Sequence, residues 1–151
     1  MKYIAYGSNL NKAQMSFRCR DAVPYKSGWL KDYRLVYRGS KTGFYATVIP
    51  CKGSYVPVGI WDISRKDEFW LDVYEGYPQF YTKILQVPVE LEDGKTIMAM
   101  MYLMRKGAKT GRPSEQYIDT VYKGYEDFNL DFRFLADSLK WNTYELQKRK
   151  R

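Results

Sequence analysis

The sequence predicts a single α+β domain in which helices flank a small, mixed and strongly curved β-sheet. Three observations support this fold class. Segments rich in β-branched and aromatic residues dominate the first two thirds of the chain, they do not alternate regularly with helices, and capped helical segments follow them. At 151 residues the chain fits one domain with its own core, residues 1–151, which ends in a basic tail from about residue 146.

The strands expected in the first half of the chain are short segments bounded by Gly, Pro or Ser. The first covers residues 2–6 and ends at Gly7, and a segment with helical character follows at 11–18. Three further strands are expected at 33–37, 44–49 and 56–63. Because no helix separates these three, a mixed or largely antiparallel sheet is favoured.

The next element is a helix with signals at both ends. Ser64 and Asp67 have the spacing of a capping box in its acidic form, so a helix should open at about Arg65. Apolar side chains then recur at helical spacing, and Gly76 and Pro78 stop the helix.

The last third of the chain is expected to hold a hairpin and two helices. The hairpin turn is predicted at Asp93-Gly94, and Ser114 is expected to cap the first helix. The expected bounds are 81–91 and 95–104 for the strands, 105–113 for a loop, and 114–125 and 131–145 for the helices.

The composition argues against several kinds of site. The chain has no histidine, and its two cysteines, Cys19 and Cys51, are too few for a disulfide scaffold and give no zinc-ligand spacing. No run is long and apolar enough for a transmembrane helix, and the N-terminus leads directly into a motif, so neither a membrane role nor a signal peptide is expected. A reduced, cytoplasmic protein is the resulting expectation.

The net charge of +8 can attract nucleic acid, a membrane surface or an anionic substrate. The basic residues are dispersed, except for the run at 148–151, which is expected to be a solvated tail. Because no nucleic-acid-binding motif accompanies the charge, nucleic acid is not the expected partner. Steeply salt-dependent binding to nucleic acid or anionic vesicles would favour that alternative.

The segment Tyr6-Gly7-Ser8-Asn9-Leu10 predicts a backbone site for a small anion. A strand that ends in Gly-Ser-Asn and then enters a helix presents free N–H groups, which bind carboxylate or phosphate. Gly7 permits a close approach of the backbone, and the Ser8 hydroxyl adds a donor. The alternative for this segment alone is an ordinary turn in which Asn9 caps the helix.

Glu75 is the candidate acid/base because it follows an apolar stretch at the predicted end of a helix. The negative pole of the helix dipole, the like charge of Asp72 and any burial would all raise its pKa. A carboxyl group with a raised pKa suits proton transfer near neutral pH. The alternative is a surface residue paired with Lys83.

Two other segments are weaker candidates. Cys19 lacks a histidine to activate it, although Arg18 and Arg20 could lower its pKa. The basic segment 105–112 lacks the spacing of a phosphate-binding loop, so a solvated loop is favoured over a lid that steers the substrate.

These segments, in this order, resemble the γ-glutamylcyclotransferase-like family. Tyr6-Gly7-Ser8-Asn9-Leu10 is similar to the family's N-terminal signature, and 71–77 with Tyr81 resembles the segment that bears its catalytic glutamate. Further similarity lies at 14–19, 59–61, 101–104 and 113–117, so the resemblance spans nearly the whole chain. Arg20 stands where bacterial members often carry proline, outside the expected site.

The resemblance implies a barrel-like α+β domain with a pocket at one end that uses no metal or cofactor. It also implies that a small γ-glutamyl substrate is converted into pyroglutamate (5-oxoproline), with release of a free amine or amino acid. By position, Glu75 would be the acid/base. The resemblance assigns substrate-binding roles to Tyr6, Gly7, Ser8, Asn9, Leu10, Tyr81, Tyr102 and Tyr117.

This chemistry suits the residues present. The α-amine of the γ-glutamyl group attacks its own γ-carbonyl, so the enzyme mainly selects the folded conformer of one molecule. One carboxylate, Glu75, can take the proton from the amine and then give it to the leaving group. The Gly7 loop could hold either the α-carboxylate or the oxyanion.

Two alternatives stay open at this point. The same mechanism could act on another leaving amine, from a protein crosslink or a γ-glutamylated metabolite. A catalytically silent module of the same fold could instead bind a γ-glutamyl-like or other anionic ligand, because a fold does not guarantee activity. The leaving group and the oligomeric state are equally open.

Overall fold

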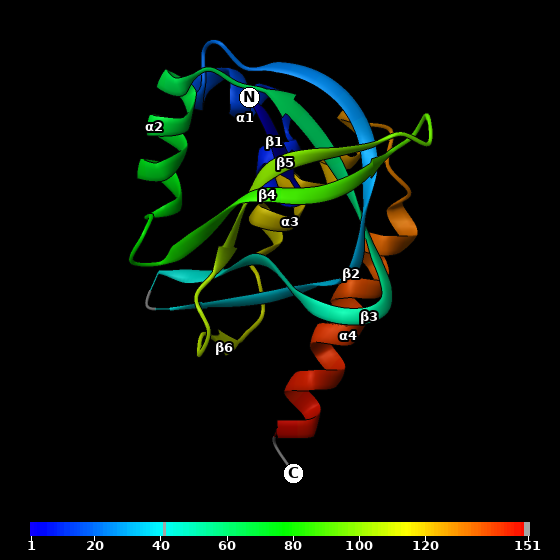
Figure 1. Ribbon diagram of the computed structural model, residues 1–151. Helices are drawn as coiled ribbons and strands as arrows, with labels where there is room; N and C mark the ends of the chain where they lie inside the picture. Colours follow the sequence, from blue (N-terminus) through cyan, green and yellow to red (C-terminus); the bar gives the residue numbers. More distant parts are fainter. Residues whose placement is uncertain (41, 150–151) are drawn as a thin grey trace.

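A computed structural model describes residues 1–40 and 42–149 (Figure 1). In chain order the elements are β1 (Lys2–Ala5), the 3₁₀ turn η1 (Ser8–Leu10), α1 (Lys12–Arg18), β2 (Val23–Ser40), β3 (Gly43–Asp62), α2 (Arg65–Glu75), β4 (Tyr81–Leu91), β5 (Thr96–Met104), β6 (Lys109–Thr110), α3 (Glu115–Asp127) and α4 (Phe132–Arg149).

The sheet closes on itself. Its strand order is β3-β1-β5-β4-β2-β6, and the pairing of β2 with β3 joins the two ends of the five-stranded part. β1 runs antiparallel to β3 and parallel to β5, so the sheet is mixed. The short strand β6 adds to β2 outside the closed part. The predicted α+β fold with a curved, barrel-like sheet is therefore confirmed.

The alternation of side chains along β1 separates two hydrophobic clusters. Ile4 and Tyr6 belong to a cluster that draws residues from all five strands of the barrel. Tyr3 and Ala5 point the other way, into a cluster shared with the helices. Because successive side chains of a strand face opposite sides, one short strand joins the barrel interior to its helical cover.

The strands of the first half are longer than predicted. The expected strands at 44–49 and 56–63 are parts of one strand, β3, and the strand expected at 33–37 is part of β2. Register shifts accommodate the intervening polar and turn-forming residues, one of them between Lys31 and Tyr33. Asp32 has a φ of 63° at this irregularity, so the chain bends without leaving the sheet.

The helices begin where their caps predict. Ser64 Oγ accepts a hydrogen bond from the Asp67 N–H, and the Asp67 carboxylate accepts one from the Ser64 N–H, each at 3.1 Å. Ser114 caps α3 with its side chain alone: its Oγ accepts a hydrogen bond from the Tyr117 N–H at 3.1 Å. The N-cap of α1 is Asn11, whose Oδ1 accepts from the Gln14 N–H at 2.9 Å. Asn9, the alternative cap, is therefore free for another role.

The last helix is longer than predicted. α4 runs to Arg149 and extends beyond the barrel at the lower end of Figure 1. It includes the first residues of the basic run that was expected to be a solvated tail, and the rest of that run, 150–151, lies outside the described residues.

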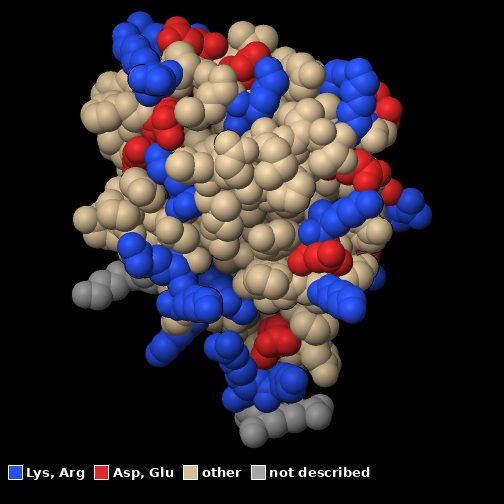
Figure 2. Space-filling model, viewed as in Figure 1, with Lys and Arg blue, Asp and Glu red and all other residues tan. Residues whose placement is uncertain are grey.

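The charged side chains on the face shown in Figure 2 are of both signs, and the blue Lys and Arg side chains gather toward the lower end, around β6 and α4. None of the helices in the described part of the chain has the length and apolar character needed to span a bilayer.

Candidate active site

A cavity of about 360 Å³ opens between the first turn after β1, the end of α2 and the start of α3. Eight of the nine predicted site residues line it, and Leu10 does not. The eight are Tyr6, Gly7, Ser8, Asn9, Glu75, Tyr81, Tyr102 and Tyr117. Leu10 is fully buried in the core instead, where it packs beside Gly124.

Glu75 is the last residue of α2, and its side chain points toward the turn that follows β1. Gly76 ends the helix with a φ of 65°, a left-handed conformation that suits glycine. The Glu75 carboxylate accepts a hydrogen bond from Asn9 Nδ2 at 3.1 Å, across 66 positions of sequence. The candidate acid/base thus lies on the wall of the cavity, half-buried.

The pKa of Glu75 is raised to about 7. Burial is the main cause, and the positive charge of Arg18 and the hydrogen bond from Asn9 oppose it. From the sequence we expected a raised pKa, with the helix dipole, the charge of Asp72 and burial as its causes. In the structure Asp72 pairs with Lys83, so the expected alternative pairing of Lys83 with Glu75 does not form.

Asn9 connects four elements at the base of the cavity. Its Nδ2 donates to the Tyr3 hydroxyl at 2.9 Å as well as to Glu75. Its Oδ1 accepts from Gln14 at 3.2 Å and from Arg18 at 2.9 Å. Because donors face Oδ1 and acceptors face Nδ2, the amide has one orientation, and Asn9 holds the Glu75 carboxylate in place.

Gly7 brings the backbone close to the opposite wall of the cavity. A Cβ at this position would lie 3.1 Å from both Ala46 Cβ and the Tyr117 hydroxyl. Among the described residues, the backbone N–H groups of Gly7 and Asn9 have no hydrogen-bond acceptor. Free N–H groups beside a cavity are suited to bind a carboxylate or an oxyanion.

Tyrosine hydroxyls surround the cavity, and most of them are engaged by backbone groups. Tyr6 donates to the Tyr102 carbonyl at 2.7 Å, and Tyr81 donates to the Ala46 carbonyl at 2.8 Å. The Tyr117 hydroxyl accepts from the Ala46 N–H at 3.0 Å. Burial raises the pKa of Tyr6 and Tyr81 well above the usual value, so these hydroxyls stay neutral and act as hydrogen-bonding groups.

Several lining residues were not found from the sequence. Arg18 places its guanidinium 4.8 Å from the centre of the Tyr74 ring while it bonds Asn9, and Tyr3 supplies the second acceptor for Asn9. From the sequence, Arg18 was considered only for its effect on the pKa of Cys19. Its spacing in the helix after the Gly7 loop, on the same face as Gln14, was the signal that could have found it.

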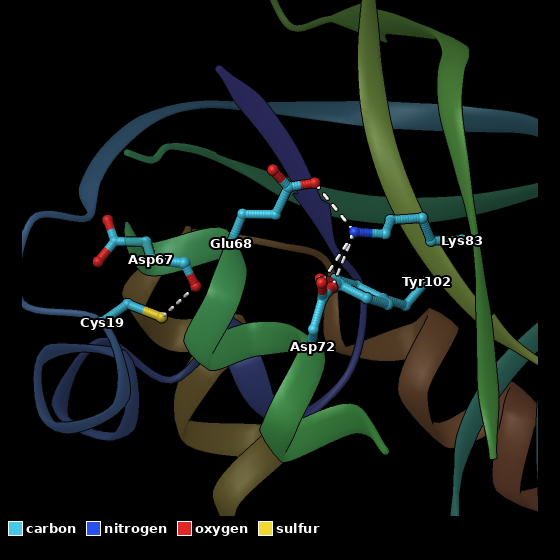
Figure 3. Close-up of polar contacts among 6 residues, drawn as sticks. All are labelled: Cys19, Asp67, Glu68, Asp72, Lys83 and Tyr102. Carbon is cyan, nitrogen blue, oxygen red and sulfur yellow. Dashed lines mark hydrogen bonds and ion pairs between the residues drawn. The ribbon is translucent and has the colours of Figure 1, made fainter. Parts of the chain in front are cut away.

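A second polar cluster lies behind the cavity, between α2 and the β4–β5 hairpin (Figure 3). Lys83 Nζ contacts Glu68 Oε2 at 3.0 Å and the two Asp72 oxygens at 2.8 and 3.1 Å. The Tyr102 hydroxyl also donates to Asp72. Of these four residues, only Tyr102 lines the cavity.

The weaker candidates lie away from the site. Cys19 is buried, its Sγ faces the Asp67 carbonyl at 3.7 Å, and burial raises its thiol pKa to about 12. No residue of the loop 105–113 lines the cavity, so the structure gives no support to the lid alternative. Within residues 1–40 and 42–149, no group of His, Cys, Asp and Glu side chains has the arrangement of a metal site.

Comparisons with known proteins find relatives over most of this chain. The sequence profile of a family described as gamma-glutamyl cyclotransferase, AIG2-like, matches residues 3–123. The gamma-glutamylcyclotransferase of Bos taurus is 28% identical over 152 residues, covering 95% of this chain and 80% of the bovine protein. That of Homo sapiens is also 28% identical, over 139 residues, covering 87% of this chain and 73% of the human protein.

The similarity extends to three dimensions. A solved structure described as gamma-glutamyl cyclotransferase superposes on this one with a TM-score of 0.84 at 27% sequence identity. The superposition covers 91% of this chain and 85% of the other.

Proposed function

This chain belongs to the gamma-glutamyl cyclotransferase, AIG2-like family, and from this membership we propose that it converts a small γ-glutamyl compound into pyroglutamate and a free amine or amino acid. The observation that carries the proposal is the place of Glu75. A carboxyl group with a pKa of about 7 lies on a cavity wall, held by Asn9 beside free backbone N–H groups. Those are the groups that an internal aminolysis needs.

The reaction begins with the α-ammonium group of the substrate, which must lose a proton before it can attack. The ionised Glu75 carboxylate takes that proton. The amine nitrogen then forms a bond to the γ-carbon, and the carbonyl oxygen becomes an oxyanion. Because the nucleophile and the carbonyl belong to one molecule, binding of the folded conformer brings them together at little further cost in entropy.

Collapse of the intermediate breaks the bond between the γ-carbon and the leaving nitrogen. That nitrogen needs a proton, which Glu75 returns, so the carboxylate ends in its starting state. A pKa near the working pH suits a group that must both accept and donate. The free N–H groups of Gly7 and Asn9 are available for the oxyanion or for the substrate α-carboxylate, and the guanidinium of Arg18 adds positive charge to the cavity wall.

The proposal is tested by mass-spectrometric detection of pyroglutamate. Wild type and Glu75→Gln are incubated with γ-glutamyl amino acids, γ-glutamyl amines and glutathione. A matched control is Glu126→Gln, an exposed glutamate on α3 that does not line the cavity. We expect the control to match wild type and Glu75→Gln to lose activity toward the upper end of the roughly 10²–10⁴-fold range of acid–base catalysis.

The panel also identifies the leaving group. Product from wild type only, with intact folding and pyroglutamate binding in Glu75→Gln, supports the proposal. Near-normal turnover by folded Glu75→Gln would remove Glu75 from the mechanism. No product from any substrate, together with retained ligand binding, would favour the silent binding module.

A further inference from the structure

We propose that Lys83, acting through Asp72 and Tyr102, is a positioning residue for the proposed acid/base Glu75. Lys83 lies on β4 and its side chain is only 10% exposed. It does not line the cavity, so it cannot act on the substrate directly. The proposal rests on the proposed function in that Glu75 is taken as the group that transfers the proton.

The Lys83 ammonium is surrounded by charged and aromatic partners. It is shared by two carboxylates of α2, Glu68 at 3.0 Å and Asp72 at 2.8 Å (Figure 3). It also lies 4.5 Å from the centre of the Tyr77 ring. Those acids are 21% and 28% exposed. A cation this far from water is retained only when charged partners compensate its lost hydration, so the contacts are specific rather than incidental.

Asp72 connects the Lys83 ammonium to the end of α2. Its side chain binds Lys83 and accepts from the Tyr102 hydroxyl, while its backbone carbonyl accepts the Tyr77 N–H at 2.9 Å. That last bond closes the left-handed turn at Gly76, immediately after Glu75. Asp72 therefore fixes the last turn of α2 to the hairpin, and the direction of the Glu75 side chain depends on that turn.

A second series of contacts connects the cluster to the Glu75 carboxylate. The Tyr102 ring meets the Tyr3 ring edge-on, with centroids 5.9 Å apart. The Tyr3 hydroxyl accepts from Asn9 Nδ2, which also donates to Glu75. The backbone of Glu75 is thus held from one side through α2, and its carboxylate from the other side through Tyr102, Tyr3 and Asn9.

Loss of the ammonium would weaken both routes. Without it, α2 loses the ion pairs that hold it to β4, and Glu68 and Asp72 become two adjacent, uncompensated carboxylates that would turn toward water, so the end of α2 would move away from the hairpin. Water would then reach the Glu75 carboxylate, whose raised pKa depends on burial. Besides Tyr102 of the cluster, the charged and titratable groups that face this carboxylate are Arg18, Tyr3, Tyr6, Tyr81 and Tyr117.

The test is Lys83→Met, with Lys26→Met as the matched control. Lys26 forms an ion pair with Asp93 at 2.6 Å, far from the cavity lining. For Lys83→Met we expect kcat to fall about 10- to 100-fold, as a misplacement of about 1 Å brings, and for the control no change. KM should change by less than about threefold, because binding contacts are kept.

A readout that needs no turnover separates this proposal from the proposed function. The Glu75 carboxyl is titrated by carbon-13 NMR, and in Lys83→Met its pKa should fall from about 7 toward 4.5. An unchanged or higher value would overturn the positioning role. A fall without detectable cyclotransferase activity in wild type would support the positioning and refute the proposed function alone.

A second substitution that restores the charge balance of the cluster should recover part of the lost activity. Asp72→Asn added to Lys83→Met removes one of the two uncompensated acids while its amide oxygen can still accept from Tyr102. The double variant should therefore have a higher kcat than Lys83→Met, and a value equal to or below it would contradict the mechanism. Should Lys83→Met fail to fold, Asp72→Asn alone replaces it, because it removes the charge through which Lys83 holds α2: a lowered kcat with unchanged KM supports the proposal, and an unchanged kcat overturns it.

Discussion

The site glutamate should reduce the stability of the fold that holds it. Burial raises the Glu75 pKa from 4.5 to about 7, so the folded state binds a proton more tightly than the unfolded chain does. Above pH 7 the folded state must hold the ionised carboxylate in this environment. At roughly 1.4 kcal/mol for each unit of difference in pKa, a rise from 4.5 to about 7 gives an upper bound of about 3.5 kcal/mol of lost stability.

Replacement by glutamine removes that ionisation while keeping the shape and an acceptor for Asn9. We therefore expect Glu75→Gln to be more stable than wild type by about 2–3 kcal/mol at pH 8.5. Between pH 7 and 4.5 wild type takes up its proton in the folded state, so the difference should shrink. Below about pH 4.5 both states of wild type are protonated and the difference should be close to zero.

Urea unfolding of the two proteins at a series of pH values measures this directly. Glu126→Gln, whose glutamate is exposed on α3, serves as the control and should show no such dependence. A Glu75→Gln protein that is less stable than wild type at pH 8.5, or whose gain in stability does not change with pH, would show that Glu75 is not destabilised by ionisation in the folded state.

Three further outcomes follow from the same contacts. In wild type, kcat should rise with pH around the Glu75 pKa of about 7, because only the ionised carboxylate accepts the substrate proton. A pH–rate profile without this rise would contradict the assignment of Glu75 as the base. Gly7→Ala should raise KM for the γ-glutamyl substrate and lower stability by about 1–3 kcal/mol, because its Cβ would lie 3.1 Å from the Tyr117 hydroxyl; KM measurements and urea unfolding check it. With a thiol-specific reagent at pH 8, Cys51 should react in the folded protein and Cys19 only after unfolding. Burial raises the Cys19 pKa to about 12, whereas hydrogen bonds lower the pKa of Cys51. Equal rates of reaction would refute this prediction.

Local signals in the sequence determined much of the outline. Helix caps and turn residues act within three or four positions, so Ser64, Ser114 and the Asp93-Gly94 turn could be recognised without the fold. Gly76 likewise marked the end of α2 and so placed Glu75 at a helix terminus. The order of the strands without regular helical crossovers was enough to predict a curved α+β sheet.

Other features depended on contacts that the fold alone creates. Leu10 belongs to the same segment as Asn9, yet one is buried in the core and the other faces the cavity. The sequence also named Asp72 as a cause of the raised Glu75 pKa, but the fold neutralises it with Lys83 and leaves burial as the main cause.

The two kinds of feature differ in the distance along the chain over which their interactions act. A cap or a turn is fixed by hydrogen bonds and φ values within a few residues, so the residue types report it directly. Burial, and the contact of Asn9 with Glu75 across 66 positions, exist only once the barrel has closed and α2 has packed beside it. The sequence by itself indicated which residues could carry the proposed chemistry, whereas the tertiary structure decided the distances between them and their electrostatic surroundings.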